Sequence, residues 1–414
     1  MTKRTLIHGG WVLTLGARTP NHTEADVLLE DDKVIEVGKG LRARGAEVVD
    51  ATDSIVMPGF VDTHRHLSRS LLKNLGERVS VSMDHYDPED VYAATLIGLL
   101  GAIEAGITTV VNWADIPTTD SYEEAALQAH RDAGLRTVFV HSGRNGVDGV
   151  ITRAFSSRDP RHSNFDQISK EWAAARERGM RIHAHVGTRA EDRGAVSEIR
   201  DLLADDVTLV HCSYLDSSDF DAISSSKAAV SITPASEMTG GMGSPPIQQL
   251  IDRGIRPGLG IDDERVAPGD VFAQMRATIS LQHATYFDLK LAGKSGLPNL
   301  LKTRDVIRYG TVDGARAAGL VEVTGSIEPG KQADIVVLRA DSPNIFPIND
   351  PIGAVVWGMD TSNVDWVFVG GRALMRSGFL EADVARARDL ANSAQGRVAT
   401  ASGLLVESGS VEPT

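Results

Sequence analysis

The chain has 414 residues, of which 42% are hydrophobic, and its charged side chains give a formal net charge of −14. That length suits a barrel with an accessory domain, and the acidic balance argues against nucleic-acid binding through a basic surface. The single cysteine excludes an internal disulfide or a CxxC zinc motif, and no apolar stretch approaches the ~18 residues of a membrane span. Because the N-terminus also lacks a signal-peptide pattern, we expect a cytoplasmic protein that binds neither nucleic acid nor membranes.

Both ends of the chain are rich in predicted strands. Residues 5–16, 25–38 and 46–57 alternate apolar and polar side chains, with Gly and Asp at the turns. After about residue 320 the β pattern returns in the stretches GSIEPGKQADIVVLRAD, AVVWGM and VDWVFVGGRALMRSG. We therefore expect one β domain built from residues 1–57 and 320–380.

The middle of the chain alternates short β-rich runs with helical stretches. Seven runs are clear, at residues 59–66, 107–115, 136–143, 180–187, 206–215, 228–236 and 256–264, and an eighth, at 149–157, is weak. Helices are predicted between them, for example at 88–106, 121–134 and 165–179. Repeated βα units form a parallel sheet, and eight of them close a barrel. The prediction is an α/β fold with a (β/α)8 TIM barrel over residues 58–319, and with a C-terminal helix and flexible tail over 381–414.

His64 and His66 end the first of these runs, PGFVDTHRHL. Because residues i and i+2 of a strand share a face, both imidazoles point the same way. In a βα barrel, inward residues near the carboxyl end of a strand line the active site, where two imidazoles can chelate one cation. On this motif alone, two polar residues on an exposed strand are the commoner explanation.

Later runs favour a metal site. His183 and His185 share one face of a run, and His211 and Asp262 lie at the ends of two others. Chance placement would scatter more of the 12 histidines onto helices and surface loops. Three or four histidines with one aspartate are a suitable donor set for Zn²⁺ or Fe²⁺. The sequence therefore predicts a divalent metal at the mouth of the barrel.

Together these motifs resemble the amidohydrolase superfamily, and within it the branch of chlorohydrolases, cytosine deaminases and S-adenosylhomocysteine deaminases. The matching pieces cover nearly the whole chain and are, in order, PGFVDTHRHL, EAGITTVVNWAD, the HAH run, LVHCSYL, the LGIDDE run, DGARAAGL and GSIEPGKQADIVVL. The resemblance implies a distorted (β/α)8 barrel with a β-sandwich from both termini. It also implies a metal-dependent hydrolase in which metal-bound hydroxide attacks a C–N bond, other than a peptide bond, of a small heterocyclic molecule. A deaminase (aminohydrolase) is the first expectation.

The resemblance assigns metal ligands by motif. His64, His66 and His185 correspond to ligands, because relatives have the ligand at the second histidine of the HAH run, and His183 is then a deeper packing group. The weak fourth run has no lysine to serve as the bridging carboxylated lysine of two-metal relatives. One divalent ion is therefore expected, zinc first and iron as the alternative.

His211 and Asp262 receive the catalytic roles. By resemblance, Asp262 touches the metal and acts as general base and then general acid. His211 is either a further ligand or a group that orients water and substrate. A homo-oligomer, a dimer or tetramer, is also expected.

One position departs from the family pattern. Deaminases of this branch carry Glu three residues after the strand-five ligand, where it passes a proton to the ring nitrogen, and here that position is Thr188. Thr188 is then expected to face substrate. Glu237, after the seventh run, either faces the pocket or is a solvated loop carboxylate. The missing Glu favours hydrolysis of a cyclic or linear amide as the alternative to deamination, and leaves a metal-dependent lyase or isomerase as a third option.

Four further residues are predicted to contact substrate. Arg69, Glu77 and His85 follow the first run, in a region that shapes the pocket of relatives. His141 ends the third run, where a capped polar strand end is the alternative. Cys212 is expected to point away from the pocket, because neighbours on a strand alternate faces.

Overall fold

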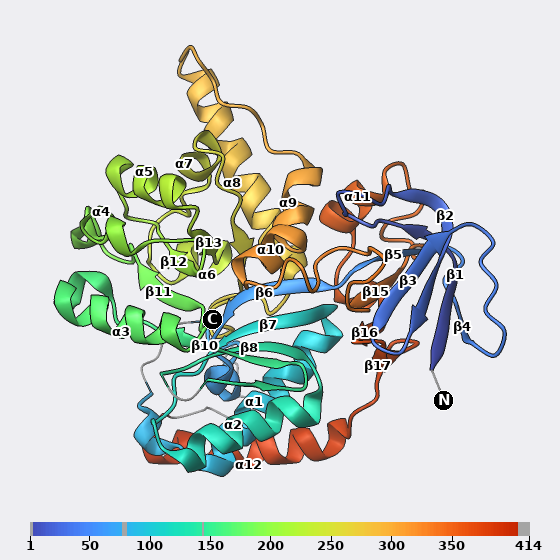
Figure 1. Cartoon of the computed structure of the whole chain (residues 1–414), viewed down its shortest axis with the longest axis horizontal. Helices are drawn as coiled ribbons and strands as arrows, with labels where there is room; N and C mark the ends of the chain where they lie inside the picture. Colours follow the sequence, from blue (N-terminus) through green and yellow to red (C-terminus); the bar gives the residue numbers. More distant parts are fainter. Residues whose placement is uncertain (1–2, 77–80, 143–144, 405–414) are drawn as a thin grey trace, which may run out of the picture.

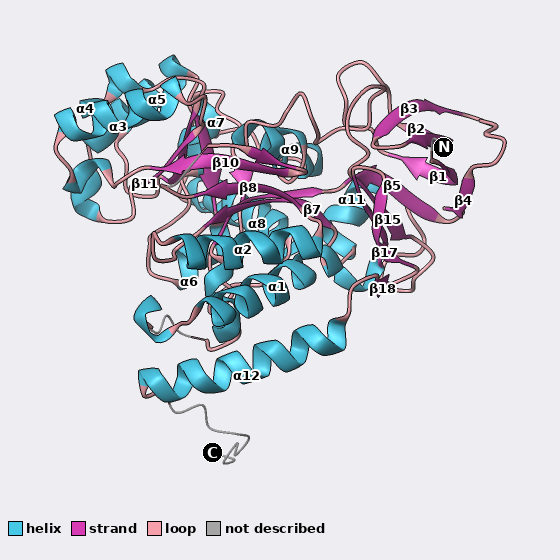
Figure 2. Ribbon diagram, turned by 60° about the horizontal axis from the view of Figure 1, so that its bottom comes forward, coloured by secondary structure: helices cyan, strands magenta, loops and turns pink. Residues whose placement is uncertain are grey.

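The computed structural model describes residues 3–76, 81–142 and 145–404. Within these residues the chain forms two bodies that lie beside each other in Figure 1, each built around a nine-stranded sheet. One sheet is a parallel barrel and the other combines strands from both ends of the chain, as Figure 2 shows from a second direction. The predicted fold, a (β/α)8 barrel with a β domain from both termini, is therefore confirmed.

The terminal sheet has the strand order β18-β17-β16-β15-β5-β1-β2-β3, with β4 beside β1. Its strands are β1 (Arg4–Val12), β2 (His22–Glu30), β3 (Lys33–Gly38), β4 (Glu47–Asp50), β5 (Ser54–Pro58), β15 (Ile335–Arg339), β16 (Val364–Val369), β17 (Arg372–Arg376) and β18 (Phe379–Leu380). The two chain ends meet where β5 pairs with β15, from Pro58 opposite Ile335 to Ser54 opposite Arg339. This sheet has a hydrophobic core of its own.

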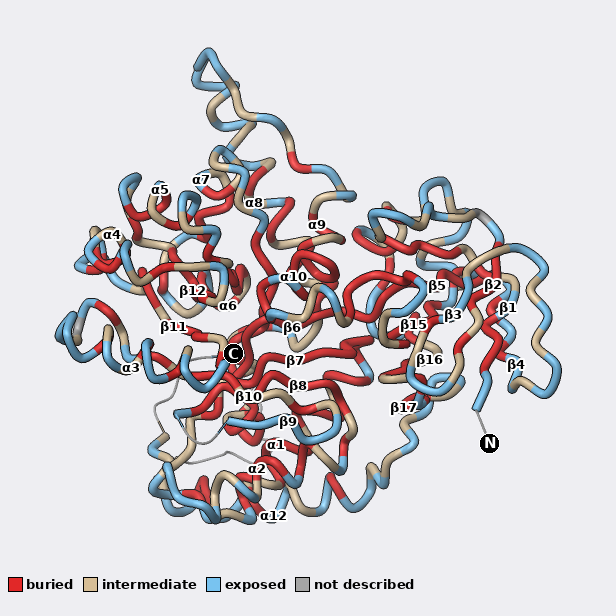
Figure 3. Tube along the Cα trace, viewed as in Figure 1, coloured by how far each residue is buried: buried red, intermediate tan, exposed pale blue. Residues whose placement is uncertain are grey.

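The barrel follows the strand order β6-β7-β8-β10-β11-β12-β13-β14, and each neighbouring pair is parallel. The strands are β6 (Phe60–Arg65), β7 (Ile107–Trp113), β8 (Arg136–Val140), β10 (Ile151–Ser156), β11 (Ile182–Val186), β12 (Val207–His211), β13 (Ala229–Ile232) and β14 (Gly258–Leu259), with the short β9 (Val147–Asp148) on β10. Every residue of β6 is buried, and Figure 3 shows the central barrel strands buried along most of their length. The weak run at 149–157 is thus the fourth strand, β10.

Main-chain hydrogen bonds close the barrel between its last and first strands. The N–H of Ile261 donates to the carbonyl of His64 (3.0 Å), and the N–H of His66 donates to the carbonyl of Asp262 (3.0 Å). Gly260 makes this approach possible, because a Cβ there would lie 2.8 Å from the backbone nitrogen of His64. The closure brings the histidines of β6 beside Asp262.

Helices surround the barrel and follow its strands in the chain. They are α1 (Pro88–Glu104), α2 (Asp120–Ala133), α3 (Phe165–Glu177), α4 (Ala195–Glu198), α5 (Ser217–Ser226), α6 (Pro234–Thr239), α7 (Ile247–Asp252), α8 (Val271–Leu291), α9 (Thr303–Tyr309) and α10 (Val312–Ala317). Local signals explain their limits: Pro88 opens α1 after the capping residue Asp87, and Gly134, with φ of 74°, ends α2.

One predicted strand is wrong. The stretch AVVWGM was expected to be β, but Ala354–Gly358 is helical and continues directly from α11 (Pro351–Gly353). The side chain of Asp350 accepts hydrogen bonds from the N–H groups of Ile352 and Gly353, so the helix has a strong start. This cap and the burial of Val355 and Val356 outweigh the strand preference of the two valines.

The C-terminal helix α12 (Val384–Ser402) packs against α1, on the outside of the barrel (Figure 2). The predicted flexible tail falls mostly on residues 405–414, which lie outside the described residues. The domain limits after residues 57, 319 and 380 stay predictions. None of the helices in the described ranges has the length and apolar character that crossing a membrane requires.

Candidate metal centre

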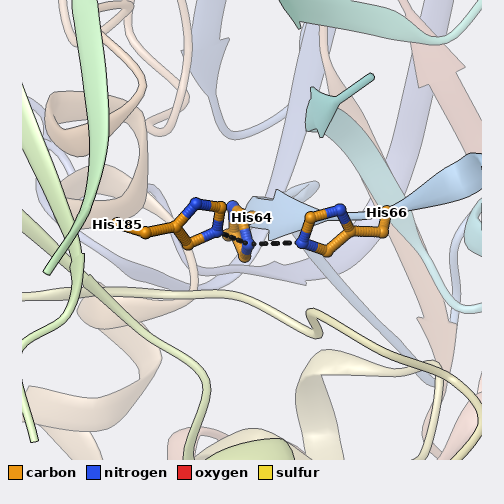
Figure 4. A group of neighbouring side chains, drawn as sticks. All are labelled: His64, His66 and His185. Carbon is orange, nitrogen blue, oxygen red and sulfur yellow. Dashed lines mark hydrogen bonds between the residues drawn. The ribbon is translucent and has the colours of Figure 1, made fainter. Parts of the chain in front are cut away.

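Three imidazoles meet at the carboxyl end of the barrel strands, as Figure 4 shows. His64 lies in β6, His66 directly after it and His185 in β11. The Nε2 atom of His64 is 3.2 Å from Nε2 of His66 and 3.1 Å from Nε2 of His185. A tetrahedral zinc ion with bonds of about 2.0–2.1 Å holds its ligand atoms about 3.3 Å apart, so this spacing suits a shared ion.

Asp262 and His211 complete the cluster. The Oδ1 atom of Asp262 is 3.3 Å from Nε2 of His66 and 3.7 Å from Nε2 of His64. The ring of His211 stacks on that of His185, with ring centroids 5.3 Å apart. His64, His211 and Asp262 each offer a ligand atom within 4.8 Å of the others, as do the three histidines of Figure 4. The structure thus brings together all five residues predicted as metal ligands.

The backbone around the cluster takes an unusual conformation. His211, Cys212 and Asp262 have φ angles of 76°, 65° and 64°, in the left-handed region that non-glycine residues seldom adopt. Such outliers concentrate at functional sites, where the surrounding structure holds them in place. Cys212 itself is fully buried in the main hydrophobic core, and burial raises the pKa of its thiol well above the usual value.

The charge state of His64 and His185 fits a neighbouring cation. Burial, and then the neighbouring imidazoles, lower the pKa of both His64 and His185 well below the usual value. Neutral imidazoles with facing Nε2 atoms have lone pairs to offer, and within the described part of the chain Nδ1 of His64 has no hydrogen-bond partner. Neutral histidines and one carboxylate are the donors that Zn²⁺ and Fe²⁺ take in proteins. The residues present therefore fit a divalent ion.

Asp115 is a member of the site for which the sequence analysis assigned no role. Its Oδ2 atom lies 3.0 Å from Nδ1 of His66, and Arg69 donates a hydrogen bond to the same oxygen. Burial by itself would raise the pKa of Asp115, but His66 and Arg69 outweigh burial and hold it below the usual value. A carboxylate behind a metal-binding histidine fixes its ring and raises its basicity. One feature of the sequence could have identified Asp115: it lies just after the second barrel strand, as Asp262 lies just after the last barrel strand.

A cavity of about 550 Å³ adjoins this side of the cluster. Arg69 and His141, both predicted to contact substrate, line it together with Trp113, Asp115, Tyr86 and Arg265. The ring of Trp113 also lies 4.1 Å from that of His185, centroid to centroid, so the cavity borders the cluster. His141 is 5% exposed, and its Nδ1 atom lies 3.7 Å from Oε2 of Glu123.

The other predicted contact residues differ in their surroundings. His85 is exposed and does not line this cavity, while Thr188 is half-buried and donates its backbone N–H to Asp192. Glu77 lies outside the described residues. Glu237 is fully buried, and its Oε1 atom is 3.1 Å from Nδ1 of His211. The interpretation of Glu237 as a solvated loop carboxylate is therefore wrong, because the residue lies in α6 and its carboxylate is buried against His211.

Residues 55–374 match the amidohydrolase family. The chain belongs to this family. The family predicted from the motifs is thus confirmed.

Curated relatives of this amidohydrolase align over most of its length. It is 26% identical to a 5-methylthioadenosine/S-adenosylhomocysteine deaminase of Pelotomaculum thermopropionicum, over 89% of this chain and 93% of the relative. It is 28% identical to a 5'-deoxyadenosine deaminase of Methanothermobacter thermautotrophicus, over 86% of this chain and 90% of the relative.

Two solved structures share the fold of this amidohydrolase. An adenosine deaminase from Xanthomonas campestris with bound zinc superposes with a TM-score of 0.84 at 19% identity, over 96% of this chain and 98% of that one. The zinc complex of atrazine chlorohydrolase from Arthrobacter aurescens TC1 gives a TM-score of 0.82 at 20% identity, over 94% of this chain and all of the other.

Proposed function

We propose that this amidohydrolase is a metal-dependent hydrolase that cleaves a C–N bond, other than a peptide bond, of a small heterocyclic molecule, most simply as a deaminase. The observation that carries the proposal is the convergence of three histidine Nε2 atoms and one Asp262 oxygen beside a cavity. The relatives named as deaminases support the choice of reaction.

The proposed ligands are His64, His66, His185 and Asp262, with His211 as a ligand or an orienting group. When bound, a divalent ion would supply Lewis-acid activation of water and of the electrophilic carbon. We favour one zinc ion, with iron as the alternative. The donor set suits both metals, and the sequence of β10, ITRAFS, contains no lysine to bridge a second ion.

Asp262 is the proposed general base and then general acid. Burial raises its pKa, but the hydrogen bond with His66 and the neighbouring imidazoles together outweigh burial, so the pKa lies well below the usual value. At neutral pH Asp262 is therefore a carboxylate, which is the form that can accept a proton from water. Ser236 donates a hydrogen bond to Oδ2 (2.6 Å), which leaves Oδ1 directed at the histidines. As the C–N bond breaks, the same group passes the proton to the nitrogen, so that it leaves as the neutral amine.

The cavity is the proposed substrate site. Trp113 offers a flat apolar ring next to His185, which suits a planar heterocycle, and Arg69 and His141 offer polar contacts at the walls. The second candidate reaction is hydrolysis of a cyclic or linear amide. It is favoured by Thr188, which stands where deaminases of this branch carry a proton-transferring Glu and has no acid group to protonate a ring.

The test begins with the metal content of the purified protein and a screen for ammonia release. The panel is purines, pyrimidines, pterins and triazines, with cyclic and linear amides as a second arm, in water enriched in ¹⁸O. We expect ammonia with ¹⁸O in the product. Amide cleavage without ammonia release would select the second reaction, and a product without ¹⁸O would instead indicate a lyase or isomerase.

We also propose a cytoplasmic location and a homo-oligomer, a dimer or tetramer. The single cysteine and the absence of a disulfide framework suit a reducing compartment. Fractionation of cells and light scattering on the purified protein test these two points.

A further inference from the structure

The short helix α6 (Pro234–Thr239) reaches both residues proposed for catalysis. Ser236 donates to Asp262, and Glu237, the next residue, contacts His211. Ser236, Glu237 and Thr233 are all fully buried. A single helical turn after β13 therefore contacts both Asp262 and His211, through Ser236 and Glu237.

The Oε1 atom of Glu237 accepts several hydrogen bonds. The backbone N–H of Thr233 donates to it at 2.8 Å, and the Thr233 hydroxyl donates at 3.2 Å. Nδ1 of His211 lies 3.1 Å from the same oxygen and 3.2 Å from the Thr233 hydroxyl oxygen. Both of these oxygens can accept a hydrogen bond from the Nδ1–H group of His211, because the Thr233 hydroxyl already donates its own hydrogen to the carboxylate.

This arrangement selects one tautomer of His211. A carboxylate oxygen only accepts, so the ring carries its proton on Nδ1 and keeps a lone pair on Nε2. We infer that Glu237 is a positioning residue that fixes this tautomer and the ring orientation of His211 as a metal ligand, with Thr233 as its support. The inference rests on the proposed metal centre and explains why a carboxylate is buried at this position.

The positioning role differs from that of a replacement for the missing proton-transferring Glu. A group that passes protons to substrate must lose its function when it becomes an amide. A group that holds an imidazole by accepting its N–H keeps much of its function as an amide, because the amide oxygen accepts the same bonds. Glu237→Gln therefore separates the two roles.

The test uses Co²⁺-loaded full-length protein, because the visible spectrum of Co²⁺ reports the geometry of its ligands. Glu237→Ala is expected to weaken metal binding by about 10–100-fold and to change the spectrum. Glu237→Gln is expected to keep the parent spectrum and to lose about fivefold in metal affinity and kcat. Glu191→Gln, at an exposed position after β11, removes the same charge and controls for net electrostatics.

Two outcomes would overturn the inference. One is a Glu237→Ala protein with the spectrum and metal affinity of the parent. The other is a Glu237→Gln protein with the parent spectrum and a kcat as low as that of Glu237→Ala. If Glu237→Ala fails to fold, Thr233→Val and Glu237→Gln together provide the test. A shifted spectrum is then expected for Thr233→Val, and the parent spectrum for Glu237→Gln. A parent protein that binds no Co²⁺ or Zn²⁺ would instead contradict the proposed function.

Discussion

Strands β6 and β11 both carry a His-x-His motif, and only one of them directs both histidines at the candidate metal centre. In β6, His64 stands one residue before the end of the strand and His66 just beyond it. In β11, His185 joins the cluster, whereas His183 lies two residues earlier. Among the described residues neither ring nitrogen of His183 has a hydrogen-bond partner.

The difference is one of depth along the strand. Residues two apart share a face but are separated by about 6.6 Å along the strand. A metal site at the carboxyl end of a barrel is reached only from the last positions of each strand. The His-x-His motif thus predicts which face of the strand the histidines share, while their distance from the end of the strand decides which of them join the cluster.

The largest expected effect comes from replacing one histidine of β11, His185, while a replacement of the other, His183, is the control. His185→Ala removes a proposed ligand, and we expect bound metal to fall and kcat/KM to drop by about a thousandfold or more, about 4 kcal/mol. His183→Leu is the matched control and should keep both. Metal content by elemental analysis and steady-state rates provide the measurement. Equal losses in the two variants would contradict the comparison.

Asp262→Asn should have the next largest effect. The amide cannot accept the proton of water, so kcat is expected to fall by about 10²–10³-fold, within the range of general acid–base catalysis. Folding should persist, because the amide oxygen can still accept the hydrogen bond of Ser236. Rates and thermal melting measure the two effects. Activity near that of the parent would exclude Asp262 as the base.

The sequence predicted those parts of the site that depend on local pattern. The strand ends carrying His64, His185 and His211 follow from apolar runs that any barrel strand must have. Glu237 and Asp115 lie in the short segments just beyond strand ends. Their conformation depends on contacts with residues distant in the chain, as when Asp115 meets Arg69. The side-chain environment of such segments cannot be read from periodicity.

The same limit explains the mistaken strand at AVVWGM. Two valines in an apolar run favour a strand, and the capping role of Asp350 outweighs that preference only once the segment packs in the core. Gly260 is a contrasting case, since its need for glycine arises from closure of the barrel against His64. The order of the elements was predictable because each βα unit repeats the same pattern.

His183 should reveal itself in the pH dependence of stability. Burial, and then the charge of Arg181, lower its pKa to about 3 from a usual value of 6.5. Because the folded-state pKa is below the unfolded one, this stability is complete above about pH 6.5 and is lost as the pH falls toward 3. His183→Leu removes this loss, so the free energy of unfolding of the variant should fall less steeply as the pH is lowered. Between pH 7 and pH 5 the parent should lose about 2 kcal/mol more than the variant. Urea unfolding of both proteins at pH 7, 6 and 5 measures the difference, and parallel curves would contradict the buried neutral state.

The smallest effect is expected from Thr188→Val, three residues after His185. Thr188 donates its backbone N–H to Asp192, a contact that valine retains, and the side chains of threonine and valine have nearly the same shape. If β11 supplies the site through His185 alone, kcat should stay within about twofold of the parent. The measurement is kcat and KM on the substrate found in the screen. A loss of tenfold or more in kcat would mean that the Thr188 hydroxyl acts on the substrate, and that β11 contributes a second polar group beyond its histidine.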